Sequence, residues 1–391
     1  MRAPGQGLAA AAAAVLILLI FAPEFAAAAD PLVQDLQGSL DLSHFDRYWS
    51  ELEKEARHFL PELSWQKLLE QFQGGESDLD PRAFLGGLGR FFFGEVLLNL
   101  KLLGQILLLA VAAAFLKNLE NAFERQQVAA LTRSIVFIVL VGICLHGFTA
   151  AMGMAGRTID QMVDFSLSSL PALVALVAAQ GSVASSAVLH PLVVFGINFF
   201  GSLIRNIIFP LIYFSAVLGL VDHFSPQFKV GKLSGFFKEL SGWGMGICMT
   251  IFVGILAVQG VAGTVADAVG LRTAKYVTSA FVPVVGKILS DAVETVAGAS
   301  LILKNSIYLT GVVLLFLLTL FPLAKLAAVT LIYKLGAALV EPLGESELGS
   351  CINVMGNSLA LVLAALACTA LIFFLAVTAI VSAGNAAIMF R

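Results

Sequence analysis

Long apolar runs separated by short polar segments make up most of the chain beyond residue 93. A membrane-spanning helix needs about 20 predominantly apolar residues, and most of these runs reach or approach that length. The pattern therefore predicts an all-α, polytopic membrane protein with a multi-span domain over residues 94–391. The predicted spans are 94–116, 134–155, 166–181, 184–201, 204–221, 242–262, 306–322, 324–341 and 358–382.

Residues 1–29 have the pattern of a cleavable signal peptide. Arg2 precedes an apolar core from Leu8 to Phe21, and Ala27–Ala29 then form an A-x-A-like cleavage site before Asp30. The alternative is an uncleaved first anchor, for which the apolar core is short. In either case the residues after Asp30 are expected outside the cytoplasm.

Residues 30–93 predict a small extracytoplasmic helical region. Apolar residues follow a 3.6-residue period from Phe45 to Phe59, in a helix that Ser43 can cap and Pro61 ends. A second short helix spans Trp65 to Phe72. So few residues cannot build a large core of their own, so we expect these helices to lean on the bilayer or on a partner.

Composition agrees with a membrane protein, because charged residues make up 13% of the chain and about 25% of a typical soluble domain. The net charge of -3 and the lack of a Lys/Arg-rich block give no indication of nucleic-acid binding. The expected surrounding is the lipid bilayer.

Basic loops predict the orientation, because Lys and Arg accumulate on the cytoplasmic side. Two basic segments are therefore expected inside, and an acidic loop without Lys or Arg fits outside, although acidic residues contribute little to that rule. The inside residues are Lys117, Arg125, Arg133, Lys229, Lys232 and Lys238, and the acidic loop holds Glu341, Glu345 and Glu347.

The region between Met162 and Val221 is interrupted by Pro171, Pro191 and Pro210. If both basic segments are cytoplasmic, the chain crosses the membrane there an odd number of times. Three short crossings satisfy this requirement, and so does one crossing plus a re-entrant hairpin. Both arrangements stay open.

A charged stretch within residues 271–298 stands out in this apolar chain. With Lys287 at 0° on a helical wheel, Asp291 falls at about 40° and Glu294 at about 340°, so all three share one face. Arg272 and Lys275 share one face of the preceding segment. Two amphipathic helices are therefore predicted, with a break at Pro283 and Gly286.

Three interpretations of this stretch stay open. The two helices could lie in the membrane interface with their charges in water. Their charged faces could instead line a conduit or contact a partner subunit. The third interpretation is a buried ion-pair bracket between spans.

Motifs of the common membrane-bound enzymes are missing from the sequence. None of the five histidines is followed by glutamate, so there is no H-E-x-x-H zinc motif. A P-loop, a G-x-S-x-G elbow and a C-x-x-C pair are missing as well. We therefore expect a protein that is not an enzyme and carries no cofactor, no metal site and no catalytic residues.

Several stretches together resemble the stage III sporulation protein AE family of endospore-forming bacteria. The order of a signal peptide, a short helical ectodomain and a polytopic region matches as well. The stretches are KLLGQILLLA (101–110), HPLVVFGINFFGSLIRNIIFPLIYFSAVLGLV (190–221), GLRTAKYVTSAFVPVVGKILSDA (270–292), ASLILKN (299–305) and FPLAKLAAVTLIYKLGAALVEPLG (321–344).

The resemblance implies a non-enzymatic membrane component of a secretion-like channel complex between mother cell and forespore, required for late forespore gene expression. It implies a location in the mother-cell-derived outer forespore membrane. The implied partners are other sporulation membrane proteins of the same operon, including a cytoplasmic ATPase and ring-forming subunits. The alternative function is secondary transport of a small solute, which the proline-interrupted region would suit.

Overall fold

The computed structural model describes residues 43–56, 64–74, 81–122, 126–179, 183–224, 229–281, 285–344 and 346–389, and every element within these ranges is a helix. The predicted all-α class is confirmed. The predicted signal peptide lies outside the described residues. The helices are α3 (Ser43–Ala56), α4 (Trp65–Gly74), α5 (Pro81–Ala122), α6 (Gln126–Ala179), α7 (Val183–Leu203), η1 (Ile204–Ile208), α8 (Phe209–Phe224), α9 (Gly231–Phe281), α10 (Val285–Val340), η2 (Glu341–Leu343) and α11 (Ser346–Met389).

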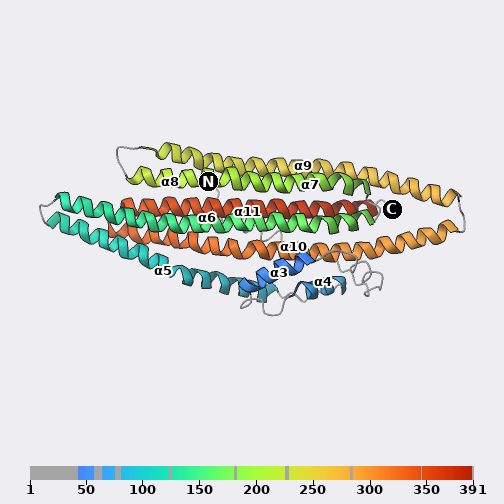
Figure 1. The fold of residues 1–391 in the computed structure, drawn as a ribbon, viewed down its shortest axis with the longest axis horizontal. Coiled ribbons are helices and arrows are strands. Elements are labelled where there is room, and N and C mark those ends of the chain that lie inside the picture. Colours follow the sequence, from blue (N-terminus) through green and yellow to red (C-terminus); the bar gives the residue numbers. More distant parts are fainter. Residues whose placement is uncertain are drawn as a thin grey trace.

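The long helices lie side by side along the longest axis of the molecule (Figure 1). They are much longer than a bilayer is thick. With 56 residues, α10 is about 84 Å long at about 1.5 Å per residue, whereas a bilayer with its headgroups measures about 40–45 Å. The bundle must therefore extend well beyond one membrane.

Six helical segments of the described chain are long and apolar enough to span a membrane, so the nine predicted spans are wrong. Segments 134–155 and 166–181 join in α6, 184–201 and 204–221 join in α7–η1–α8, and 306–322 and 324–341 join in α10. The six segments are Gly86–Leu116, Ile135–Ala178, His190–His223, Gly231–Ala257, Asn305–Leu343 and Ser346–Ala379.

Prolines do not end these helices. Pro171, Pro191 and Pro322 lie inside helices, and Pro210 directly follows a π-helical turn. In that turn, η1, the backbone N–H of Phe209 donates to the carbonyl of Ile204. The wider turn lets the helix continue past a proline that cannot donate a hydrogen bond of its own.

The region between Met162 and Val221 therefore crosses once. α6 continues to Ala179, and α7–η1–α8 returns along the bundle as one nearly continuous rod. This single crossing satisfies the required odd number, and the described residues form no re-entrant hairpin.

The acidic turn between α10 and α11 lies at the same end of the bundle as the loops after α5 and α8 (Figure 1). At this end the ammonium of Lys334 donates to the amide oxygen of Asn353. Gly219, close to the end of α8, lies against Val354 of α11 and Ser234 of α9. An external acidic loop is thus incompatible with two internal basic loops. The prediction that the acidic loop lies outside is therefore the wrong one, because acidic residues contribute little to orientation.

We had expected α3 and α4 to lean on the bilayer or on a partner. They pack instead on the bundle itself. The rings of Phe45 and Tyr48 contact Phe165 of α6, with centroids 5.6 and 5.3 Å apart. Phe45 also lies against Gly311 of α10. The indole N–H of Trp65 in α4 donates to Asp46 of α3 at 2.7 Å, which ties the two short helices together.

Candidate functional site

The charged stretch forms the tip of a hairpin made by two of the longest helices. Arg272 and Lys275 lie near the end of α9, and Lys287, Asp291 and Glu294 lie near the start of α10. The two ends extend beyond the neighbouring ends of α6, α7 and α11 (Figure 1). The two predicted helices are present, each as the continuation of a longer helix. The side chains of all five charged residues lie outside the described part, so their roles stay predictions.

An ion pair joins α6 to the π-helical turn. The guanidinium Nη1 of Arg205 lies 2.9 Å from the carboxylate Oδ2 of Asp160. Gly156 leaves room for the guanidinium, because a Cβ there would collide with it. Arg205 lies inside the continuous rod of α7, η1 and α8. Both side chains are about half exposed, so the pair contributes only about 0–1 kcal/mol to stability.

A second polar contact joins α10 to α11. The ammonium of Lys334 donates to the amide oxygens of Asn353 and Asn357, with the first bond 2.8 Å long. Gly356 lies against the aliphatic part of the same lysine. Two neutral acceptors on α11 therefore hold the cation of α10 within a candidate membrane span, where an unsatisfied charge would be costly.

Buried hydroxyl groups join further pairs of helices. The phenol of Tyr333 in α10 donates to the carbonyl of Cys144 in α6 at 2.7 Å, and Tyr333 is fully buried. Ser215 of α8 and Ser234 of α9 exchange hydrogen bonds, each hydroxyl donating to the carbonyl of the other residue. These bonds favour the observed register of neighbouring helices, because a buried polar group usually needs a hydrogen-bond partner.

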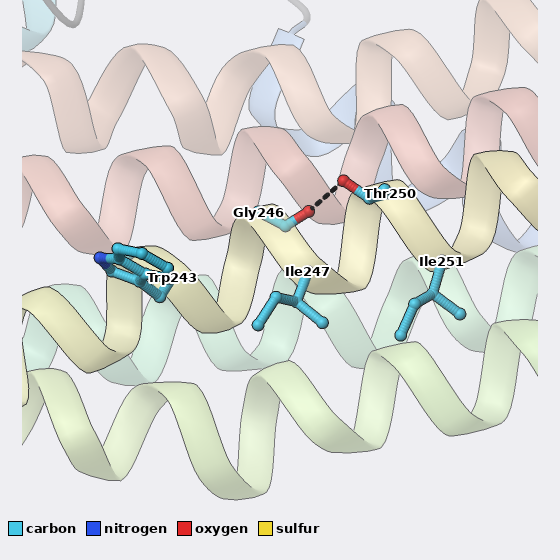
Figure 2. Close-up of a pocket in the computed structure, with 6 residues that line it drawn as sticks. Trp243, Gly246, Ile247, Thr250 and Ile251 are labelled. Atoms are coloured by element: carbon cyan, nitrogen blue, oxygen red, sulfur yellow. Dashed lines mark hydrogen bonds between the residues drawn. The ribbon is translucent and has the colours of Figure 1, made fainter.

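A groove is open along α9 on the described surface. It has a volume of about 470 Å³ and is lined by Gly242, Trp243, Gly246, Ile247, Thr250 and Ile251. Figure 2 shows that the labelled side chains come from a single helix and that Thr250 bonds back to Gly246. A groove without converging polar groups offers nothing for catalysis or for holding a polar substrate.

Metal chemistry finds no support in the described part of the chain. No group of three or more His, Cys, Asp or Glu side chains there could hold a metal ion. The four cysteines are free thiols, three of them buried and Cys368 partly buried. Several polar side chains that do meet, such as Lys334 with Asn353, connect helices to one another.

Sequence reasoning missed the partners of these polar residues. Asp160, Tyr333 and Asn357 each meet a group from another helix, and nothing in the linear pattern pairs them. The available signal was glycine, since Gly147 and Gly156 lie where the Tyr333 and Arg205 side chains cross α6. A glycine inside an apolar helix can mark such a close approach.

Comparison with known families agrees with the resemblance seen in the sequence. The family described as Stage III sporulation protein AE matches residues 63–384. The chain belongs to this family. It is also 37% identical over 368 residues to the stage III sporulation protein AE of Bacillus subtilis (strain 168), an alignment that covers 94% of this chain and 92% of that relative. No solved structure matches the chain.

Proposed function

We propose that this multi-pass membrane protein is a non-enzymatic component of a channel or secretion-like complex between mother cell and forespore. Membership in the stage III sporulation protein AE family carries the proposal, because it gives the chain a role in sporulation. In this proposal the protein resides in the outer forespore membrane and supports late forespore gene expression.

Two structural features support an assembly role over catalysis. Described polar contacts, such as Tyr333 with Cys144 and Lys334 with Asn353, tie helices together, and the groove along α9 has a mainly apolar lining. In addition, the helices run far beyond the thickness of a bilayer, which offers surface to other proteins outside the membrane.

The tip of the α9–α10 hairpin is the proposed contact with the rest of the complex. It extends past the neighbouring helix ends (Figure 1), so other subunits can reach it. It also carries the charges Arg272, Lys275, Lys287, Asp291 and Glu294. Its proposed partners are membrane and ring-forming proteins of the same operon, with a cytoplasmic ATPase at the opposite end.

The test changes the charges of the tip without touching the bundle. In a sporulating host, Lys287→Glu with Asp291→Ala should block a late forespore reporter while the protein accumulates and localises normally. An i,i+4 pair with lysine first contributes only about 0.2–0.5 kcal/mol to a helix, so folding should survive. Co-purification of the ring-forming proteins should fall in parallel.

A matched control makes the same charge changes elsewhere. Lys67 and Glu70 are exposed on α4, and Lys67→Glu with Glu70→Ala should leave the reporter active. Normal reporter activity in the Lys287/Asp291 variant would reject the tip as a contact. An active reporter in a strain lacking the whole protein would reject the channel role itself.

A further inference from the structure

Two cations lie close together at the end of the bundle where α9 begins and α10 ends (Figure 1). Lys238 lies two turns into α9, and Lys334 lies in the last turns of α10. The two ammonium groups are near enough to repel each other electrostatically. Both lysines belong to candidate membrane spans. Like charges in such surroundings are costly unless an anion compensates them.

The described part of the chain does not supply that anion, because neither lysine is paired with a carboxylate there. The ammonium of Lys334 donates to the amide oxygens of Asn353 and Asn357, which are neutral. Each amide also carries two N–H donors. Glu239, next to Lys238 in the sequence, lies about 100° further around α9. The cluster therefore offers an anion two ammonium groups and the N–H groups of two amides.

Helix contacts place the members of this cluster at one level of the bundle. Ser234 of α9 and Val354 of α11 both lie against Gly219 of α8. Helices α9 and α11 run in the same direction (Figure 1). Lys238, one turn after Ser234, is therefore level with Asn357, about one turn after Val354. The cation cluster thus combines α9, α10 and α11.

The groove along α9 begins one turn after Lys238 (Figure 2). Lys238, Gly242 and Gly246 are four residues apart, so they follow one side of the helix with a drift of about 40° per step. From Gly242 to Ile251 the groove is about 14 Å long. Half of a bilayer hydrocarbon core measures about 15 Å. The groove therefore leads from the cations into the candidate span over about the depth of one leaflet.

Two glycines keep this groove open. A Cβ at Gly242 or at Gly246 would meet nothing within 4 Å. Packing among the described residues therefore does not require glycine at either position, although glycine weakens a helix. The apolar side chains beside them, Trp243 and Ile247, are exposed. The groove is thus free to receive a molecule from outside the chain.

We infer that an anionic phospholipid binds here, with its phosphate at Lys238 and Lys334 and one acyl chain along the groove of α9. The N–H groups of Asn353 and Asn357 can donate to oxygens of its headgroup. Basic pockets between membrane helices bind anionic headgroups by the same chemistry. This inference rests on contacts of described residues and does not depend on the proposed channel role.

Charge and shape together select this occupant. A soluble phosphate would compensate the lysines but would leave the apolar groove without a ligand. A zwitterionic lipid would fill the groove, but its own cation already neutralises its phosphate. An apolar helix of a partner would leave both cations uncompensated. Phosphatidylglycerol carries one net negative charge and two acyl chains, and it therefore satisfies the cluster and the groove at once.

The fluorescence of Trp243 can report this binding, because its side chain lines the groove and is 73% exposed. The other two tryptophans, Trp49 and Trp65, lie in α3 and α4. The full chain is reconstituted in phosphatidylcholine, and quenching by phosphatidylglycerol with brominated acyl chains is compared with quenching by equally brominated phosphatidylcholine. We expect phosphatidylglycerol to be favoured about tenfold. Equal quenching would overturn the inference and leave the surface to an acidic partner helix.

Variants of the two lysines test the headgroup contact. Lys238→Gln with Lys334→Gln should remove the preference for phosphatidylglycerol. Lys238→Gln alone, at an exposed position, should lower it to about threefold. Lys67→Gln with Lys101→Gln removes the same charge from exposed positions of α4 and α5 and should keep the preference. Equal losses in the two double variants, or no loss in either, would overturn a specific site.

A leucine in the groove tests the acyl-chain contact. Gly246→Leu should remove most of the preference, whereas Gly142→Leu, at an open and exposed position of α6, should keep it. An unchanged preference in the Gly246 variant would overturn the place of the acyl chain. Inorganic phosphate should not relieve the quenching, and relief would mean that the site binds a soluble anion instead. Variants are compared only when they elute at the same volume as the parent protein.

Discussion

At the scale of single residues, Gly147 and Tyr333 are in very close contact. A Cβ at position 147 would collide with the Tyr333 hydroxyl, which bonds to Cys144. We expect Gly147→Ala to destabilise the protein by about 1–3 kcal/mol, the usual cost of overpacking, measured as a lower melting temperature in detergent. In a Tyr333→Phe background the collision is removed, so the same change should cost much less.

Gly142 provides the control for this prediction, since it lies on the same helix with nothing within 4 Å. Gly142→Ala should be neutral or stabilising by up to about 1 kcal/mol, because alanine favours the helix. Equal losses at both glycines would contradict a specific contact. Such contacts could not be predicted from the sequence, because Tyr333 and Cys144 are 189 residues apart and periodicity shows only which face is apolar, never its partner.

At the scale of elements, the sequence predicted that the elements are helices, but it did not predict where the long helices begin and end. Apolar periodicity predicted the helices, including those on both sides of Pro283. Nine spans were predicted because the apolar runs were divided at residues 156–165, 202–203 and 323. The structure continues as helix through these positions, and also through Pro171, Pro191 and Pro322, because packing along a long helix outweighs the one hydrogen bond that a proline loses. The region of α3 and α4 was likewise predicted to be helical. Its packing on α6 and α10 could not be predicted, because it depends on how the chain folds.

The docking of α3 yields a prediction at this scale. Phe45 is 2% exposed and contacts Trp65 and Phe165. Phe45→Ala should cost about 3–5 kcal/mol locally and open α3 and α4 to limited proteolysis, while the long helices stay resistant. Ser50→Ala, at an exposed position of α3, should leave the digestion pattern unchanged. An intact α3 in the Phe45 variant would mean that other contacts dock it.

At the scale of the whole molecule, the membrane character followed from composition, whereas sidedness depended on how many times the chain crosses. Six crossings from an extracytoplasmic start place the end of α10 inside and the end of α11 outside. Nine crossings would reverse both.

We therefore expect alkaline phosphatase, which is active only outside the cytoplasm, to be inactive when fused after Val340 and active when fused after Arg391. Activity after Val340 together with inactivity after Arg391 would restore the nine-span topology and the external acidic loop. The reason for expecting the opposite is physical. The turn from Glu341 to Leu343 lies at the end of the bundle that carries the basic loops (Figure 1), and lysine and arginine outweigh glutamate in deciding which end stays in the cytoplasm.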